Sequence, residues 1–187
     1  SDLGKLTIGT VAALARTVDA KSKWTAGHSE RVADLAVRIA QVMGFTSEDQ
    51  NTLHRVGLLH DIGKIGIPMK LLDKPGKLSD EEYEAIKTHP AIGGKILEPI
   101  EVYKDIIPLV EQHHERYDGK GYPRGLAGKE IDLSARILCV ADVFDALISQ
   151  RPYRDGWVKD KVVSFMDENK GVMFDPEVID VLLALEI

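Results

Sequence analysis

The chain lacks paired cysteines and long apolar runs, the features that stabilise secreted proteins and anchor membrane proteins. It has one cysteine, Cys139, which cannot form an internal disulfide. No run approaches the ~18 apolar residues that a membrane span requires, and no charged and apolar leader is visible before the first helical pattern. Cations are the minority, because 24 Lys and Arg face 30 Asp and Glu and leave a net charge of −6. We therefore expect a cytoplasmic domain without a membrane segment, and no DNA or RNA duplex as a partner.

Alternating β-branched runs of the kind that form strands are also scarce, whereas apolar residues recur at helical spacing along almost the whole chain. With 187 residues, of which 44% are apolar, the chain is long enough for one substantial core. We predict an all-α fold in a single domain over residues 1–187. Residues 1–22 are expected to connect to an upstream sensor or receiver domain, so that the chain is a piece of a longer protein. That first helix could also pair with a copy of itself in a homodimer.

Apolar spacing and capping residues predict where the helices lie. Ser47 and Ser134 should each open a helix, and Gly44 should follow the end of one. Pro108 should start or kink the helix around it, because it has no amide donor. The expected helices cover about residues 8–20, 32–43, 47–63, 79–87, 102–113, 134–148, 158–168 and 176–186, with one more starting at Pro90. The segment 115–133 is broken by glycines and a proline and should be a long, irregular, functional loop.

The chemistry is concentrated in the histidines, of which there are six. Any one histidine on an apolar stripe is more often a hydrogen-bonded core residue than a metal ligand. Here, however, five of them lie beside acids, at helix ends or on apolar stripes: His28, His60, His89, His113 and His114. Burying so much imidazole and carboxylate is costly, and a shared cation would compensate that cost. The combination therefore favours a metal site.

The donor types indicate which metals the site would bind. Imidazole and carboxylate without a nearby thiol suit iron or manganese, with zinc or nickel as further options, and argue against calcium and iron–sulfur clusters. Five histidines together with Asp61 and Asp142 exceed what one ion can bind, so we predict two divalent ions. Two ions about 3.5 to 4 Å apart polarise a phosphoryl oxygen and generate hydroxide at neutral pH. Phosphoester hydrolysis is the predicted reaction class.

Longer strings then resemble a known family. His60 to Lys64 read HDIGK, and His113 to Pro123 read HHERYDGKGYP. In chain order the other matching strings are GHSERV at 27–32, HP at 89–90, ADVFDAL at 141–147, RPYR at 151–154 and FDP at 174–176. Over nearly its whole length the chain resembles the HD-GYP domain family. The resemblance implies an all-α phosphodiesterase that opens the bacterial second messenger cyclic di-GMP to linear pGpG, although some members prefer a mixed GMP–AMP cyclic dinucleotide.

The resemblance also implies roles for individual residues. Asp61 would bridge the two ions, and a hydroxide bridging them would attack phosphorus. Lys64 would pair with a phosphate oxygen as charge develops there, while Tyr122, Arg151 and Arg154 would contact the dinucleotide. The full set of implied metal ligands is His28, His60, Asp61, His89, His113, His114 and Asp142. Glu115 and Asp118 are either acceptors that orient imidazoles or the acidic rim of the loop.

Two positions depart from the family pattern. Trp24 stands one helical turn before His28, where members with three metals carry an acidic ligand. Ser22 stands where the family often has an Asp near the substrate. We therefore expect two ions instead of three, and slow or absent onward cleavage of pGpG to GMP.

Two other classes of function stay open. One is an HD phosphohydrolase for a different nucleotide, such as guanosine tetraphosphate, which would share the HD ligands but not need the GYP loop. The other is a catalytically silent signalling module that binds a partner such as a cyclase domain. The loop residues argue against the first class and the intact ligands against the second.

Overall fold

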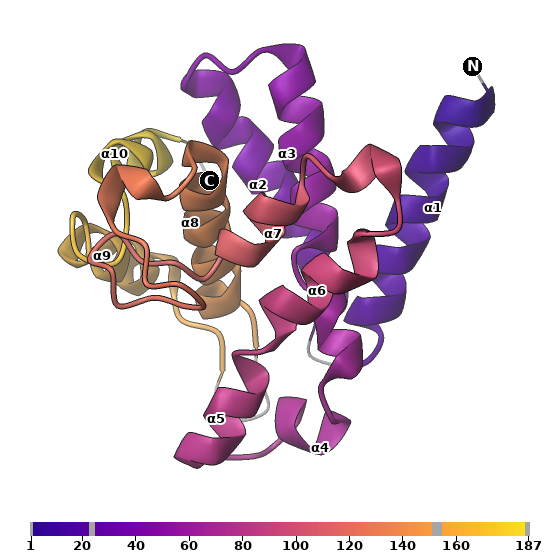
Figure 1. The fold of residues 1–187 in the computed structure, drawn as a ribbon. Helices are drawn as coiled ribbons and strands as arrows, with labels where there is room; N and C mark the ends of the chain where they lie inside the picture. Colours follow the sequence, from indigo (N-terminus) through magenta and orange to yellow (C-terminus); the bar gives the residue numbers. More distant parts are fainter. Residues whose placement is uncertain (1, 23–24, 151–154, 186–187) are drawn as a thin grey trace.

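The structure is a computed structural model that describes residues 2–22, 25–150 and 155–185 (Figure 1). Every regular element among the described residues is a helix, and in place of strands there are only two isolated bridges, which confirms the predicted fold class. The α-helices are α1 (Asp2–Asp19), α2 (His28–Val42), α3 (Ser47–Leu59), α4 (Met69–Leu72), α5 (Asp80–Ile86), α6 (His89–Leu97), α7 (Ile107–Gln112), α8 (Leu133–Ile148), α9 (Lys159–Glu168) and α10 (Pro176–Ala184). Three 3₁₀ helices connect them: η1 (Ile62–Gly66), η2 (Glu101–Tyr103) and η3 (Gly128–Glu130).

Several helix starts follow the capping chemistry, although two caps lie one or two residues earlier than predicted. Ser79 caps α5 in a capping box with Glu82, as the sequence indicates. Thr46, not Ser47, caps α3, and Asp132, not Ser134, caps α8. A cap needs extended backbone while its side chain reaches back to a helical amide. Thr46 and Asp132 have ψ angles of 161° and 141°, whereas the two serines are already inside their helices.

Helix ends also differ from the prediction in two places. Helix α3 ends at Leu59 and not near Gly63, because the chain turns there and continues as η1. A Cβ at Gly63 would lie 1.8 Å from the carbonyl oxygen of His89, so only glycine lets η1 approach α6 this closely. Val102 does not share a helix with His113, because Pro108 lies in the first turn of α7 and Val102 belongs to η2, where it is exposed.

The helices pack so that their ends converge. Helix α2 packs against α3 and α8 in the centre, while α6 packs against η1 and α7. The short helices α4 and α5 lie together at one end of the molecule, and α9 and α10 lie beside α8 (Figure 1). Residues from all the long central helices form the core, among them the fully buried Ile39, Leu53, Leu59, Ile137 and Leu138.

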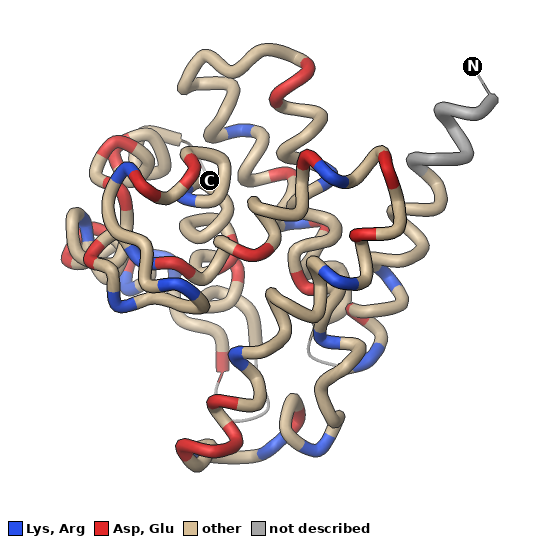
Figure 2. The backbone as a smooth tube through the Cα atoms, viewed as in Figure 1, with Lys and Arg blue, Asp and Glu red and all other residues tan. Residues whose placement is uncertain are grey.

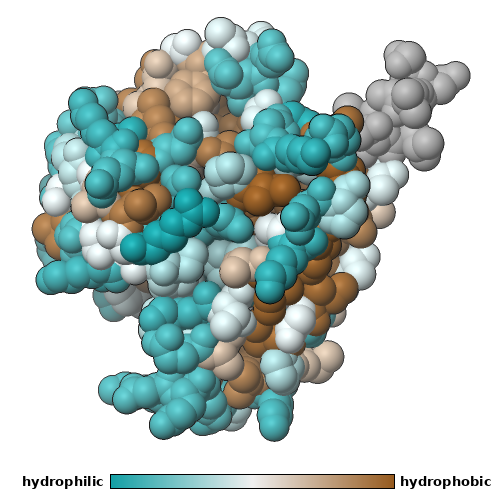
Figure 3. Space-filling view, in the orientation of Figure 1, coloured by the Kyte–Doolittle hydropathy of each residue, from teal (hydrophilic) through white to brown (hydrophobic). Residues whose placement is uncertain are grey.

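On the surface, hydrophilic side chains cover most of the face in Figure 3, and a band of hydrophobic ones runs over α6, where Ile96 is partly exposed. Lys and Arg alternate with Asp and Glu over most of the described backbone instead of forming one basic face (Figure 2). No helix among the described residues has the length and apolar character needed to span a membrane.

Candidate metal centre

The seven candidate ligands lie together where helix ends meet α8. His60 and His113 terminate α3 and α7, and His28 and His89 begin α2 and α6. Six of the seven are buried, and His114 is partly buried. Their donor atoms form two groups in which all atoms lie within 4.8 Å of one another: Asp61, His89, His113 and His114 in one, and His28, His60 and Asp142 in the other. Two such clusters are consistent with a binuclear metal site.

Asp61 lies between the two groups and directs one carboxylate oxygen toward each. Its Oδ1 is 3.4 Å from Nε2 of His89 and 4.0 Å from Nε2 of His113. Its Oδ2 is 3.4 Å from Nε2 of His60 and 3.7 Å from Nε2 of His28. This is the arrangement of a carboxylate that can donate to two ions at once.

Asp142 reaches both groups as well, from the middle of α8. Its Oδ1 lies 3.2 Å from Nε2 of His28, whereas its Oδ2 lies 4.0 Å from Nδ1 of His114. The two carboxylates come from separate segments of the chain: Asp61 from the turn after α3, and Asp142 from α8.

Three histidines are oriented by backbone carbonyls three residues earlier. The Nδ1 atoms of His60, His89 and His113 lie 2.7, 2.8 and 2.5 Å from the carbonyl oxygens of Gly57, Ile86 and Val110. These carbonyls belong to the last turns of α3, α5 and α7, where a helix leaves its acceptors unpaired. Because a carbonyl only accepts, Nδ1 of each imidazole carries the proton, and its Nε2 lone pair faces Asp61.

His28 differs from these three because a carboxylate orients it. Its Nδ1 lies 2.7 Å from Oδ2 of Asp145, and Nε of Arg31 donates to Oδ1 of the same carboxylate at 2.6 Å. The sequence prediction did not include Asp145 or Arg31. The available signal was their spacing, since Asp145 follows Asp142 by three residues on α8, and Arg31 follows His28 by three on α2.

Electrostatics set the protonation of the site. Burial raises the pKa of Asp61, but Lys64 and His60 outweigh it and hold that pKa well below its usual range. Burial and the neighbouring imidazoles lower the pKa of His113, and burial above all lowers that of His114 to about 3. At neutral pH Asp61 is therefore an ionised carboxylate, and His113 and His114 are neutral imidazoles, which are the forms that bind metal.

The residues present fit a pair of divalent ions. Nε2 of His60 and Oδ1 of Asp61 are buried and have no hydrogen-bond partner among the described residues. Leaving such acceptors unpaired is costly, and both lie inside the cluster, where a cation would accept their lone pairs. Burial raises the pKa of the Cys139 thiol to about 12, so it stays protonated and the donor set is nitrogen and oxygen.

Lys64 and Tyr122, two of the predicted substrate contacts, lie at this centre. Nζ of Lys64 donates to Oδ2 of Asp61 at 2.5 Å. The ring of Tyr122 lies 4.8 Å from that of His114, and burial raises the pKa of its hydroxyl. Arg151, Arg154 and Trp24, to which the sequence also assigned roles, lie outside the described residues.

The loop acids have a structural role instead of orienting imidazoles. The buried carboxylate of Glu115 accepts from the amides of Arg124 at 2.7 Å and Leu126 at 3.0 Å, which holds the loop against its own start. Asp118 pairs with Arg116 at 2.7 Å. Gly121 is required here, because a Cβ would lie 2.3 Å from the amide nitrogen of Arg116.

Comparisons with known proteins agree with this site. The family of HD domains matches residues 12–178. The chain is 46% identical over 167 residues to the 3'3'-cGAMP-specific phosphodiesterase 3 of Vibrio cholerae, covering 89% of this chain and 36% of that protein. It is 41% identical over 176 residues to the cyclic di-GMP phosphodiesterase response regulator RpfG of Xanthomonas campestris, covering 93% of this chain and 47% of that protein. The chain thus spans less than half the length of these curated relatives.

A solved structure has the same arrangement of helices. Bd1817, described as an HDG"Y"P protein from Bdellovibrio bacteriovorus, superposes with a TM-score of 0.70 at 27% identity, over 87% of this chain and 51% of that one. A cyclic GMP-AMP phosphodiesterase structure from V. cholerae is 41% identical over 93% of this chain and 39% of that chain, with a TM-score of 0.58. The chain belongs to the HD domain family, and its HD and GYP motifs make it an HD-GYP domain.

Proposed function

We propose that this domain hydrolyses a phosphodiester bond of a cyclic dinucleotide and opens cyclic di-GMP to linear pGpG. The observation that carries the proposal is the position of Asp61, whose two carboxylate oxygens face two separate groups of buried histidines. A pair of divalent ions held in this way supplies Lewis-acid activation of a phosphoryl oxygen and lowers the pKa of water. His89, His113 and His114 would hold one ion, His28, His60 and Asp142 the other, and Asp61 both.

The remaining residues would bind and orient the substrate. Lys64 is close enough to Asp61 to keep that carboxylate ionised, and its ammonium can pair with a phosphate oxygen as negative charge develops. Tyr122 would form a wall of the site beside His114. Arg151 and Arg154 remain proposed phosphate and guanine contacts on the strength of the sequence, since guanidinium groups match both partners.

A mixed cyclic GMP–AMP dinucleotide is the second candidate substrate. The V. cholerae relative at 46% identity is named for 3'3'-cGAMP, whereas the X. campestris relative at 41% is named for cyclic di-GMP. The two substrates share the twelve-membered ribose–phosphate ring and differ in one base. Discrimination between them would therefore depend on base contacts and not on the metal centre.

We also propose that α1 relays an input from an upstream receiver or sensor domain. The X. campestris relative is named a response regulator. In the turn that follows α1, Nζ of Lys21 donates to the carbonyl oxygens of Lys64 at 2.8 Å and Ile65 at 2.7 Å. A shift of α1 would therefore act on η1, the segment that directly follows Asp61.

The test is turnover by protein prepared without oxygen and loaded with iron or manganese. Cyclic di-GMP, 3'3'-cGAMP and guanosine tetraphosphate are incubated separately, and the products are separated by chromatography. We expect metal-dependent conversion of cyclic di-GMP to pGpG, abolished by a chelator and restored by metal. Cleavage of guanosine tetraphosphate alone would overturn the proposal, and two bound ions without any turnover would identify a silent module.

A further inference from the structure

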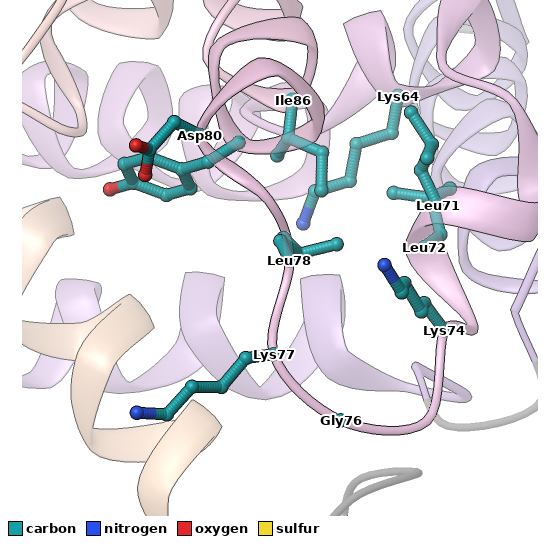
Figure 4. Close-up of a pocket in the computed structure, with 10 residues that line it drawn as sticks. Lys64, Leu71, Leu72, Lys74, Gly76, Lys77, Leu78, Asp80 and Ile86 are labelled. Carbon is teal, nitrogen blue, oxygen red and sulfur yellow. The ribbon is translucent and has the colours of Figure 1, made fainter.

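A pocket of about 690 Å³ opens beside the metal centre, between α4, the α4–α5 connection and α5 (Figure 4). Lys64 belongs to both places, because its ammonium contacts Asp61 and its side chain lines the pocket. The volume falls within the range of about 300–1,000 Å³ that is typical of small-molecule sites. The lining residues are Lys64, Leu71, Leu72, Lys74, Gly76, Lys77, Leu78, Asp80, Tyr83 and Ile86.

The lining combines apolar side chains with cations. Lys64 and Lys74 both extend their ammonium groups toward the space around Leu78 (Figure 4). Lys74 is paired with Glu82 at 2.5 Å, whereas Lys77 is exposed and has no ion pair within the described part of the chain. Of the three lining lysines, Lys64 is paired with Asp61 and Lys74 with Glu82, so Lys77 is the lining lysine whose charge is most available to an anionic ligand.

An aromatic path joins the pocket to the metal centre. The ring of Tyr122 lies between His114, at 4.8 Å, and Tyr83, at 6.4 Å, measured between ring centroids. The Nζ atom of Lys87 lies 5.5 Å from both tyrosine centroids and supports the pair. Tyr83 is 47% exposed, so part of its side chain is accessible to a ligand.

We propose that this pocket binds the half of the cyclic dinucleotide that is not being cut. Its base stacks on Tyr83 and lies against Leu78, while its phosphate faces Lys74 and Lys77. A substrate whose scissile phosphate reaches Lys64 from the metal side would extend its second nucleotide into the pocket, because Lys64 borders both. The inference rests on the proposed function, since it concerns the same substrate.

The test compares variants that alter one contact each. In metal-loaded protein, the dissociation constant of a phosphorothioate analogue of cyclic di-GMP is measured by calorimetry, and KM and kcat are measured with cyclic di-GMP. Tyr83→Ala should weaken binding about tenfold, since base–aromatic stacking contributes about 1–3 kcal/mol, whereas Tyr83→Phe should restore it. Lys77→Glu should weaken binding about three- to fivefold, because it removes the exposed contact between the lysine ammonium and the substrate phosphate. The losses should appear in KM more than in kcat.

Lys95→Glu is the matched control, because Lys95 is an exposed lysine on α6 that does not line the pocket. If Tyr83→Ala and Lys77→Glu bind the analogue within twofold of the wild type, the pocket assignment is wrong, and turnover of cyclic di-GMP by the same variants shows that the proposed hydrolysis stands without it. Binding without turnover overturns only the proposed hydrolysis. If the wild type neither binds the analogue nor turns over cyclic di-GMP, both proposals are overturned. Tyr83 and Lys77 are exposed, and thermal melting of each variant checks that it is folded.

Discussion

Oδ2 of Asp145 lies 2.7 Å from Nδ1 of His28, and the same carboxylate is held by Arg31 through Nε at 2.6 Å. His28 is thus oriented by a charged acceptor, unlike the three histidines whose Nδ1 atoms face backbone carbonyls. A carboxylate behind an imidazole fixes its tautomer and raises its basicity toward a metal.

Asp145→Asn should therefore weaken binding at one of the two ion sites by about 10- to 100-fold, as loss of such a partner typically does. The measurement is metal content after dialysis against a graded chelator, with Asp160→Asn as the control because Asp160 is an exposed acid on α9. Equal metal retention by Asp145→Asn and the wild type would show that Asp145 does not position His28 for metal binding.

Metal uptake should release a proton from His28. Burial lowers the pKa of His28, but its hydrogen bonds to Asp142 and Asp145 outweigh burial and raise the pKa to about 9. A raised pKa means that metal-free protein carries this proton at pH 7, so an incoming ion must displace it. Apparent manganese affinity should then rise by up to about tenfold per pH unit between pH 7 and 9. Calorimetry in two buffers of different ionisation enthalpy counts the protons, and a pH-independent affinity contradicts the prediction.

Asp61→Ala should lose metal and activity together, because one side chain faces both histidine groups. The fold should survive in part, since the apolar stripes of the helices do not include this residue. Elemental analysis is the measurement, and Asp34→Ala, which removes an exposed carboxylate from α2, is the control. A variant that keeps two ions per chain would show that Asp61 does not bridge.

Lys64→Ala should keep its metals but turn over about 10²- to 10³-fold more slowly, the usual effect of removing a donor that acts on developing charge. Binding should change less than kcat. Steady-state kinetics together with metal analysis separate the two effects. Unaltered turnover would make Lys64 a solvated lysine that pairs with Asp61 and does nothing further.

The wild type should hold two ions, and pGpG should accumulate from cyclic di-GMP. Trp24 lies outside the described residues, and the prediction rests on the sequence: an indole has only a donor N–H and cannot ligate a cation. Trp24→Glu would supply a carboxylate four residues before His28 in the sequence, where members with three metals carry an acidic ligand, and should raise the metal content toward three per chain. Three ions in the wild type, or GMP as its prompt sole product, would contradict the two-metal prediction.

Four of the seven candidate ligands stand out through local spacing, whereas the assignment of all seven as ligands came from the resemblance to the HD-GYP family. The pairs His60–Asp61 and His113–His114 are adjacent in the sequence, and helical periodicity places them at helix ends. Most helices were predicted for the same reason, since an amphipathic stripe needs only its own residues.

Features that depend on distant contacts could not be predicted. Asp145 and His28 are 117 residues apart, and only the packing of α2 against α8 brings them together. The role of Glu115 was missed for another reason: its carboxylate accepts from the amides of Arg124 and Leu126 across an irregular loop, and a loop has no periodicity from which its path could be predicted. Helix α4 has four residues, too few for a periodic signal, so the pocket that it forms with α5 has no signature in the sequence.

The use of helix-terminal carbonyls by His60, His89 and His113 links the lengths of three helices to metal chemistry. An insertion of one residue within α3, α5 or α7, upstream of that carbonyl, would rotate the carbonyl and the following histidine together by about 100°, so that the Nδ1 contact is kept but Nε2 turns away from Asp61. The amino-acid identities of all seven candidate ligands would be unchanged by such an insertion. Length variation in these three helices is therefore expected to be as damaging as substitution of a ligand, whereas the exposed connection between α4 and α5 is free of this constraint.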